Sequence, residues 1–217
     1  DVYKRQALAF PECPRSLGLY GVLPDAQWVG RMARAGVPTV QLRFKSEDRD
    51  AIAREVRAAV AAVEGTGALL FINDHWREAI DAGAYGVHVG QEDLDALAGA
   101  DLQAIHASGL RLGVSTHGYA EMVRAHAVQP SYIALGAVFP TTLKKMATAP
   151  QGLARLGAYV RLMQRYPLVA IGGISADQFP AVRATGVGSV AVVRALVNAE
   201  DPEAAAQQLL ASMHAAD

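Results

Sequence analysis

The sequence predicts a single (β/α)8 barrel, the α/β fold known as the TIM barrel, in which eight parallel strands alternate with covering helices. Short, wholly apolar segments alternate with longer amphipathic ones along nearly the whole chain, and this alternation is typical of a parallel sheet covered by helices. Eight such units within 217 residues fit one compact barrel with a substantial core. A doubly wound open sheet is the alternative, but its first turn is usually rich in glycine, and the turn after Val22 reads Leu-Pro-Asp.

Apolar runs and turn residues place the expected elements along the chain. Strands are expected at 17–23, 37–42, 69–72, 86–89, 110–114, 132–135, 168–171 and 187–193. Helices are expected at 25–35, 46–64, 76–82, 94–108 with a break near residue 99, 119–128, 153–166, 176–185 and 202–214. Asp25 is expected to cap the first helix, Gly83 to end the third, and Pro202 to begin the last.

Composition and charge restrict the class of protein. The net charge is -1 and 52% of the residues are hydrophobic, so neither a nucleic-acid partner nor an acidic tail is expected. No apolar run has the length of a membrane span and no secretory signal is visible, so no membrane partner is expected and the location is predicted to be cytoplasmic.

The first residues are expected to lie outside the barrel. Residues 1–16 hold two prolines and are predicted to form an irregular arm, with the barrel at 17–217. The chain begins with Asp rather than Met, so residues 1–6 are interpreted as a fragment edge or an assembly artefact. Cys13 is the single cysteine, which excludes an internal disulfide, and it is interpreted as an incidental thiol in a loose arm.

Two carboxylates stand directly after neighbouring strands, at the end of a barrel where ligands bind. Asp74 follows the strand at 69–72, and Asp93 follows the strand at 86–89. Mg²⁺ prefers one or two carboxylates together with substrate phosphate oxygens, so the pair is a candidate site for one shared cation. Helix capping is the alternative, because Asp is common in the first turn of helices.

Polar side chains follow other strands as well. Gln41, Arg43 and Lys45 fall on one side of an extended chain, and this set of residues predicts an anion site, with surface ion pairs as the alternative. Ser115, taken alone, is more typical of a helix cap than of a nucleophile. His88 lies inside a strand and is expected to be a hydrogen-bonded histidine of the barrel rather than a metal ligand.

The last three strands offer a second anion site. The long segment 136–152 is expected to be functional, because loops of this length in compact domains usually are; a disordered surface loop is the alternative. Its Thr141, Thr142, Lys144 and Lys145 are candidates to close over a phosphorylated ligand. Gly172-Gly173 and Val193-Arg194 follow the strands whose loops commonly bind phosphate in this fold. The whole pattern predicts two phosphorylated substrates, one of them a diphosphate bound through metal.

These motifs together resemble bacterial thiamine phosphate synthase from about Leu17 onward. The matching stretches are 40–45 (VQLRFK), 71–74 (FIND), 86–94 (GVHVGQEDL), 112–117 (LGVSTH), 132–136 (YIALG), 139–141 (FPT) with Lys144, and 169–174 (VAIGGI). The resemblance implies a barrel that joins a hydroxymethylpyrimidine diphosphate (here, pyrimidine diphosphate) to a thiazole phosphate, giving thiamine phosphate and diphosphate, with Mg²⁺ as cofactor. Diphosphate would leave and the thiazole nitrogen would capture a pyrimidine methylene cation.

The resemblance also implies roles for particular residues. Contacts to the pyrimidine diphosphate would be made by Gln41, Leu42, Arg43, Phe44, Lys45, Asn73, Ser115 and Lys144, with Arg43, Lys45, Ser115 and Lys144 assisting the reaction. Mg²⁺ would be held by Asp74 and Asp93. The thiazole phosphate would be bound by Thr141, Thr142, Leu143, Gly173, Val193 and Arg194.

Two positions depart from the family pattern, both on the thiazole phosphate side. Leu143 stands where the family has Thr, and Arg194 stands where it has Ser at the end of the last strand. Two alternatives therefore stay open: a thiazole phosphate tautomerase relative, which would lack the metal and diphosphate residues, and a thiazole phosphate-binding barrel without turnover. A homo-oligomer is compatible with the sequence, which does not fix the oligomeric state.

Overall fold

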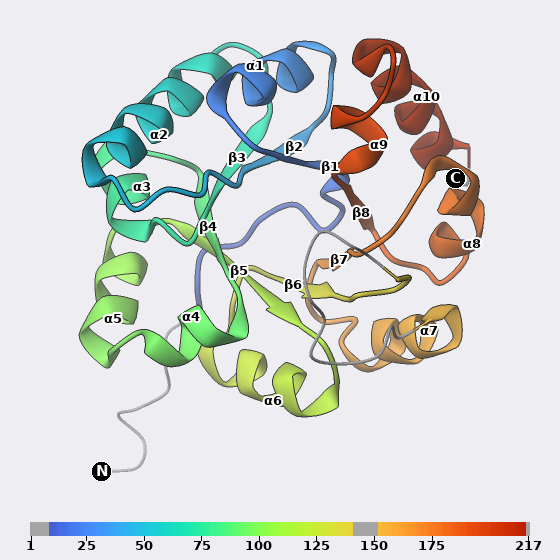
Figure 1. Cartoon of the computed structure of the whole chain (residues 1–217). Helices are drawn as coiled ribbons and strands as arrows, with labels where there is room; N and C mark the ends of the chain where they lie inside the picture. The colour runs from blue at the N-terminus through green and yellow to red at the C-terminus, as the bar shows by residue number, and fades with distance from the viewer. Residues whose placement is uncertain (1–8, 141–151, 216–217) are drawn as a thin grey trace.

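The computed structural model describes residues 9–140 and 152–215, and its strands form one closed parallel barrel. The strands follow one another around the barrel in chain order, and the last pairs with the first. Helices surround the sheet, as the view along the barrel shows (Figure 1). The predicted (β/α)8 fold is confirmed.

The elements alternate from one end of the barrel to the other. The strands are β1 (Gly18–Leu23), β2 (Thr39–Leu42), β3 (Leu69–Asn73), β4 (Gly86–Val89), β5 (Arg111–Thr116), β6 (Tyr132–Leu135), β7 (Leu168–Ala170) and β8 (Ser189–Val192). The helices are α1 (Ala26–Arg34), α2 (Arg49–Val63), α3 (Trp76–Ala82), α4 (Gln91–Ala96), α5 (Gly99–Ala107), α6 (Tyr119–Val128), α7 (Gly152–Leu162), α8 (Phe179–Arg183), α9 (Arg194–Val197) and α10 (Pro202–His214), with a 3₁₀ turn, η2 (Ala176–Gln178), before α8.

The helix ends follow the local signals in the sequence. Asp25 caps α1 by accepting a hydrogen bond from Trp28 N at 2.9 Å. Gly83 ends α3 in the left-handed region, with φ of 72°, and Pro202 is the first residue of α10. These three predictions are confirmed.

Three elements differ from the prediction at the end of the barrel where polar residues gather. β5 runs on to Thr116, so Ser115 belongs to the strand, whose ladder with β6 continues through Thr116 and Leu135. Helix α4 begins at Gln91, directly after β4, and is separate from α5. Helix α9 was not predicted, because four residues are too few to show helical periodicity.

The apolar core has two parts. Leu, Ile and Val side chains such as Val40, Ile72 and Val190 are fully buried between the sheet and the helices. A second cluster fills the barrel itself and is built around Tyr20, Phe71 and Tyr132. Their rings contact one another at centroid distances of 5.0 to 6.1 Å. The barrel interior is therefore a packed aromatic core, as expected for a barrel of eight strands.

The described part of the arm, residues 9–16, is not loose. Phe10 is buried and its backbone N–H donates to Gln129 O at 3.0 Å. The Cys13 thiol donates to Ser131 O at 3.3 Å, and burial raises its pKa to about 11. The prediction of a loose arm is wrong for these residues. Phe10 is buried, and the arm forms hydrogen bonds with the residues that lead into β6. The high pKa agrees with an unreactive thiol.

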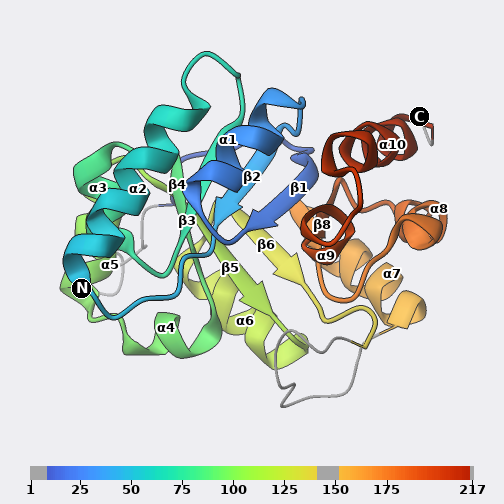
Figure 2. The same ribbon diagram turned by 45° about the horizontal axis from the view of Figure 1, so that its top comes forward.

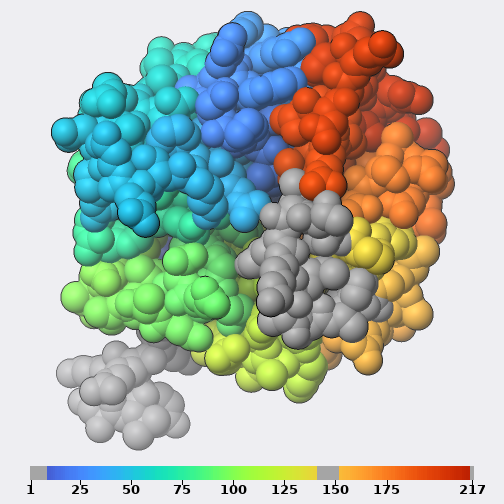
Figure 3. Space-filling view, in the orientation of Figure 1, coloured from blue at the N-terminus to red at the C-terminus, as the bar shows by residue number. Residues whose placement is uncertain are grey.

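The outer helices form a continuous wall around the sheet. Arg31 on α1 makes an ion pair with Glu203 on α10, and Gln207 donates to Ala35 O at 2.7 Å. The turned view places α2 and α3 outside β3 and β4, and α8 and α10 on the opposite side (Figure 2), and the side chains of α2, α1 and α10 form one surface (Figure 3). Among the described residues, no helix combines the length and the apolar character needed to cross a bilayer.

Candidate active site

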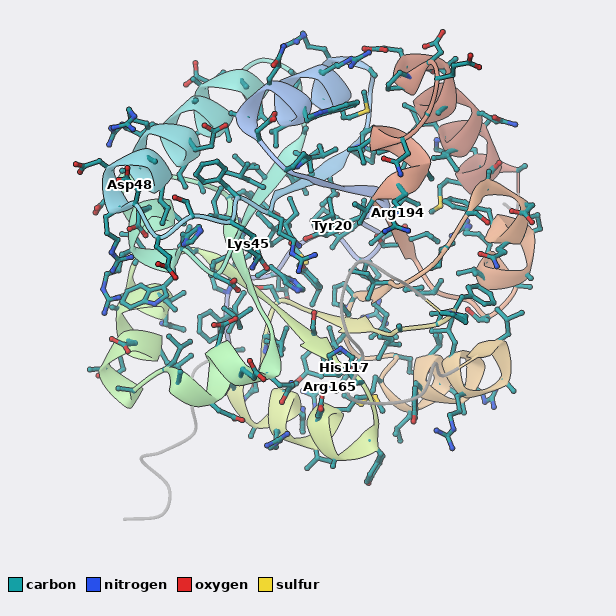
Figure 4. The ribbon with its side chains drawn as sticks, in the orientation of Figure 1. Tyr20, Lys45, Asp48, His117, Arg165 and Arg194 are labelled. Carbon is teal, nitrogen blue, oxygen red and sulfur yellow. The ribbon has the colours of Figure 1, made fainter. Side chains whose placement is uncertain are left out.

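A cavity of about 770 Å³ opens at the carboxyl ends of the strands. Its wall is made by the ends of β2 to β5, by the loops after β6 and β7, and by the start of α9. Tyr20 lies near the barrel centre, and Lys45, His117 and Arg194 lie around it on different sides (Figure 4). This is the end of the barrel where active sites are found in this fold.

The structure brings most of the predicted site residues into this one cavity. The described members that line it are Gln41, Arg43, Lys45, Asn73, Asp74, Asp93, Ser115, Gly173, Val193 and Arg194. Thr141, Thr142, Leu143, Lys144 and Lys145 lie outside the described residues. Segments from six different strand ends thus converge, although they are spread over more than 150 positions of the chain.

Strand alternation decides which residues after β2 reach the cavity. Gln41, Arg43 and Lys45 line it, as the predicted spacing requires. Leu42 is fully buried and Phe44 packs against the core between sheet and helices, so neither side chain lines the cavity. The inclusion of Leu42 and Phe44 among the substrate contacts is therefore not supported for their side chains.

Asp74 and Asp93 face each other across the junction between β3 and β4. Asp74 has a φ of 65°, and its backbone N–H donates to His88 O at 3.0 Å, which fixes the turn after β3. Lys45 Nζ donates to Asp74 Oδ2 at 2.9 Å. Asp93 lies in the first turn of α4, so the unpredicted start of that helix at Gln91 is what places its carboxylate here.

The two carboxylates have opposite pKa shifts because they lie in hydrogen-bond contact and only Asp74 is also paired with Lys45. Partial burial and hydrogen bonding to the Asp74 carboxylate raise the pKa of Asp93 to about 6. Partial burial also acts to raise the pKa of Asp74, but the hydrogen bond with Asp93 and the Lys45 ammonium outweigh it and lower that pKa. A cation between the two carboxylates would relieve the repulsion that raises the pKa of Asp93.

The donor set fits Mg²⁺ better than a metal held entirely by protein. Among the residues that the structure describes, no group of three or more His, Cys, Asp or Glu side chains is arranged to hold a metal. Two carboxylates beside a cationic cluster are the donors expected when substrate phosphate oxygens complete the shell. Nearby, Gln91 Oε1 is buried without a hydrogen-bond partner in the described structure.

Replacing Asp93 by Asn is expected to stabilise the metal-free protein above about pH 6. A raised carboxyl pKa means that wild-type stability falls as the pH rises from 3.8 to about 6, since the folded state then loses a tightly held proton. Asn avoids this loss and would raise the free energy of unfolding by about 1 kcal/mol, after allowance for solvent screening at this exposed side chain. Urea denaturation with a chelator, above and below that pH, measures the effect; equal stabilisation at both would contradict it.

A buried chain of hydrogen bonds runs beneath the cavity, from Gln41 to Ser115. Gln41 Nε2 donates to Tyr20 Oη at 2.9 Å, and Tyr20 Oη lies 2.6 Å from Tyr132 Oη. Tyr132 Oη lies 2.6 Å from His88 Nδ1, and His88 Nε2 lies 2.7 Å from Ser115 Oγ. His88 is therefore the hydrogen-bonded barrel histidine that was predicted, and Ser115 is held by it rather than acting as a helix cap.

Sequence reasoning missed the two tyrosines of this chain and Gln91. Gln91 Nε2 donates to Ser115 O at 2.9 Å and so joins α4 to β5. Tyr132 crosses the barrel only because Gly113 has no side chain: a Cβ there would lie 2.1 Å from the Tyr132 ring. The glycine in the Leu-Gly-Val-Ser run was the signal available, but nothing in the sequence shows which ring it accommodates.

The opposite wall of the cavity is made of glycine and of the start of α9. Gly172 and Gly173 have φ of 102° and 66°, and a Cβ on Gly173 would lie 2.4 Å from Pro140 O. Arg194 is exposed at the first position of α9 and makes no ion pair with any other described side chain. This wall thus exposes backbone groups of the glycines and the guanidinium of Arg194 to the cavity, and both kinds of group can bind a phosphate.

Fold and cavity together define a (β/α)8-barrel enzyme for small substrates. The family model for thiamine monophosphate synthase matches residues 22–196. The thiamine-phosphate synthase of Neisseria meningitidis serogroup B is 57% identical over 197 residues, covering 91% of this chain and 95% of that protein, and the one of Salmonella schwarzengrund is 53% identical over 201 residues, covering 93% and 94%. The chain belongs to the thiamine monophosphate synthase family and is a transferase of thiamine biosynthesis.

A solved structure agrees with this assignment. Thiamine phosphate pyrophosphorylase from Pyrococcus furiosus superposes with a TM-score of 0.81 at 27% identity, covering 93% of this chain and 98% of that one. A 3-hexulose-6-phosphate synthase, with a TM-score of 0.63 at 21% identity, shares the fold alone.

Proposed function

We propose that this chain catalyses the Mg²⁺-dependent condensation of the pyrimidine diphosphate with the thiazole phosphate, releasing thiamine phosphate and diphosphate. The observation that carries the proposal is the convergence of Arg43 and Lys45 with Asp74 and Asp93 in one cavity of a member of this family. A tautomerase relative would have no use for this combination of metal and diphosphate groups.

The pyrimidine diphosphate is proposed to bind across β2 to β5. Arg43 and Lys45 would contact its phosphates, with Lys144 added from outside the described residues. Asp74 and Asp93 would hold Mg²⁺. Asn73, buried at the end of β3, and Gln41 would contact the pyrimidine. The tight Lys45–Asp74 pair supports this arrangement, because it already places a cation beside the carboxylates.

The reaction needs charge stabilisation and positioning rather than a protein nucleophile. The chemistry supplied by bound Mg²⁺ is neutralisation of the charge that develops on departing diphosphate. Arg43 and Lys45 would neutralise the same charge from the other side. The electron-rich aminopyrimidine stabilises the methylene cation that remains, and the thiazole nitrogen captures it. Ser115 and Gln41 would hold the pyrimidine in place for that attack.

Thiazole phosphate is proposed to bind against Gly173, Val193 and Arg194, and the other predicted contacts, Thr141, Thr142 and Leu143, lie outside the described residues. Replacing Arg194 by Ser, the usual family residue, is expected to raise the KM for thiazole phosphate about tenfold, because a guanidinium that pairs with no other described side chain is available for a charge-assisted hydrogen bond to phosphate. Steady-state kinetics at saturating pyrimidine diphosphate measure it. Arg57→Ser on α2, remote from the cavity, is the control; a lower KM for R194S would mean that Arg194 crowds the site.

One assay tests the proposed function. The purified protein is incubated with both substrates and Mg²⁺, and thiamine phosphate is measured against a sample with excess chelator. Product that depends on both substrates and on the metal is expected. No product at any thiazole phosphate concentration would refute the synthase proposal, and tight binding of thiazole phosphate without product would favour the binding barrel.

The cytoplasmic location and the homo-oligomer stay predictions.

A further inference from the structure

The buried hydrogen-bond chain (Gln41, Tyr20, Tyr132, His88 and Ser115) has a direction, because its protons can be counted. Burial raises the pKa of both tyrosines above the ordinary value, and each therefore contributes one hydroxyl proton. A neutral imidazole contributes one N–H donor and one acceptor. The direction then depends on which hydroxyl hydrogen is left over: Tyr20 is buried and has to donate its hydrogen within the chain, whereas Ser115 can donate into the cavity.

Gln41 sets that direction at one end. Its Nε2 donates to Tyr20, so the Tyr20 hydroxyl donates its own hydrogen onward to Tyr132. Tyr132 in turn donates to His88 Nδ1. His88 must then carry its hydrogen on Nε2, from which it donates to Ser115 Oγ. The Ser115 hydroxyl is left to donate into the cavity, and Gln41 Oε1 is left as an acceptor at the same cavity.

We propose that Tyr20, Tyr132 and His88 are positioning residues that select an aminopyrimidine over an oxopyrimidine. An aminopyrimidine presents an amino donor next to a ring-nitrogen acceptor, which matches an acceptor on Gln41 and a donor on Ser115. An oxopyrimidine presents a carbonyl acceptor that opposes the Gln41 acceptor, and its ring N–H can bind Ser115 only if the hydroxyl turns its own hydrogen away. The inference rests on the proposed function, because it takes the pyrimidine to bind between these two side chains.

The chain is held rigidly enough to act as such a selector. Tyr20, Tyr132 and Gln41 are at most 3% exposed, and His88 is 5% exposed, so water cannot readily replace a lost link. The Tyr132 ring stacks on His88 with a centroid distance of 5.7 Å. The absence of a side chain on Gly113 provides the space that the Tyr132 ring occupies. A reversal would require the Gln41 amide and every hydroxyl in the chain to turn together.

The direction can be tested without turnover. Nitrogen-15 NMR of histidine-labelled protein without substrate reports which ring nitrogen of His88 carries hydrogen, and the spectrum of a His88→Gln variant assigns the signal. Nε2 is expected to be protonated in the wild type, and Tyr132→Phe is expected to lose this preference, because it removes only the oxygen that donates to Nδ1. Hydrogen on Nδ1 in the wild type would overturn the proposal, whether or not the protein makes thiamine phosphate.

Kinetics test whether the chain acts through Ser115. Tyr132→Phe is expected to lower kcat about tenfold, which is the usual effect of losing one buried hydrogen bond to a working group. In a Ser115→Ala background the same change is expected to have no further effect, because the end of the chain is already gone. A full tenfold loss in that background would show a structural role instead and would overturn the proposal.

Selectivity supplies the last measurement. The oxo analogue of the pyrimidine diphosphate is expected to inhibit the wild type with an inhibition constant about 100-fold above the KM of the amino substrate, and Tyr132→Phe is expected to reduce this ratio to about tenfold. Tyr166→Phe is a matched control: its hydroxyl lies 2.6 Å from His126 Nδ1, away from the cavity, and its loss should change neither ratio nor kcat. An unchanged ratio in Tyr132→Phe would refute the selector role.

Discussion

Replacing Asp74 by Asn is expected to reduce Mg²⁺-dependent turnover by on the order of 10³-fold while the barrel stays folded. Asn keeps the shape of the side chain and tolerates the positive φ of 65° at this position. It removes the negative charge that pairs with Lys45 at 2.9 Å and that raises the pKa of Asp93. The measurement is the rate of thiamine phosphate formation as a function of Mg²⁺ concentration, with circular dichroism to confirm folding.

Asp95→Asn is the matched control for Asp74→Asn. Asp95 lies on α4 beside the site, is exposed, and pairs only loosely with Arg124 at 3.6 Å. Its loss removes the same charge from the same region, so a general electrostatic effect would appear in both variants. Mn²⁺ binding followed by electron paramagnetic resonance separates the causes further. If Asp74→Asn kept the Mn²⁺ affinity and the turnover of the wild type, this carboxylate would not be a metal ligand.

The part of the site that carries the cations and the carboxylates was largely predictable, because it depends mainly on the two-residue alternation of side chains along a strand and on the order of the strands. Alternation along β2 separates Gln41 and Arg43 from Leu42 in any parallel barrel. Consecutive strands are neighbours, so the residues directly after β3 and β4, such as Asp74, had to meet at one edge, whereas the position of Asp93 also depends on the early start of α4. Neither inference requires knowledge of how side chains pack inside the barrel.

The hydrogen-bond chain was not predictable for the opposite reason. β1 and β6 are apolar on both faces, so the sequence does not show that Tyr20 and Tyr132 point inward. The two hydroxyls meet across the barrel from positions 112 residues apart, and no local pattern reports such a distance. Helix α9 and the packing of the arm also depend on tertiary contacts, which override the weak local signals of short segments.

Replacing Gly173 by Ala is expected to raise the KM for thiazole phosphate about 100-fold and to leave the KM for the pyrimidine diphosphate nearly unchanged. The new Cβ would lie 2.4 Å from Pro140 O and 2.9 Å from Phe139 O, so the backbone that leads into the loop after β6 must move. A displacement of about 1 Å at a substrate-positioning segment is enough for a loss of this size. Separate titrations of the two substrates in steady-state kinetics measure it.

Gly83→Ala separates this contact from the backbone strain that accompanies it. Gly83 has a φ of 72°, close to the 66° of Gly173, but no atom of the described residues lies within 4 Å of a Cβ built on it. Both variants should therefore lose about 1–2 kcal/mol of stability from placing Ala in the left-handed region. Only Gly173→Ala should also change the KM for thiazole phosphate. Equal kinetics in the two variants would mean that Gly173 serves the turn alone, and the phosphate site would then have to lie elsewhere on the wall formed by α9.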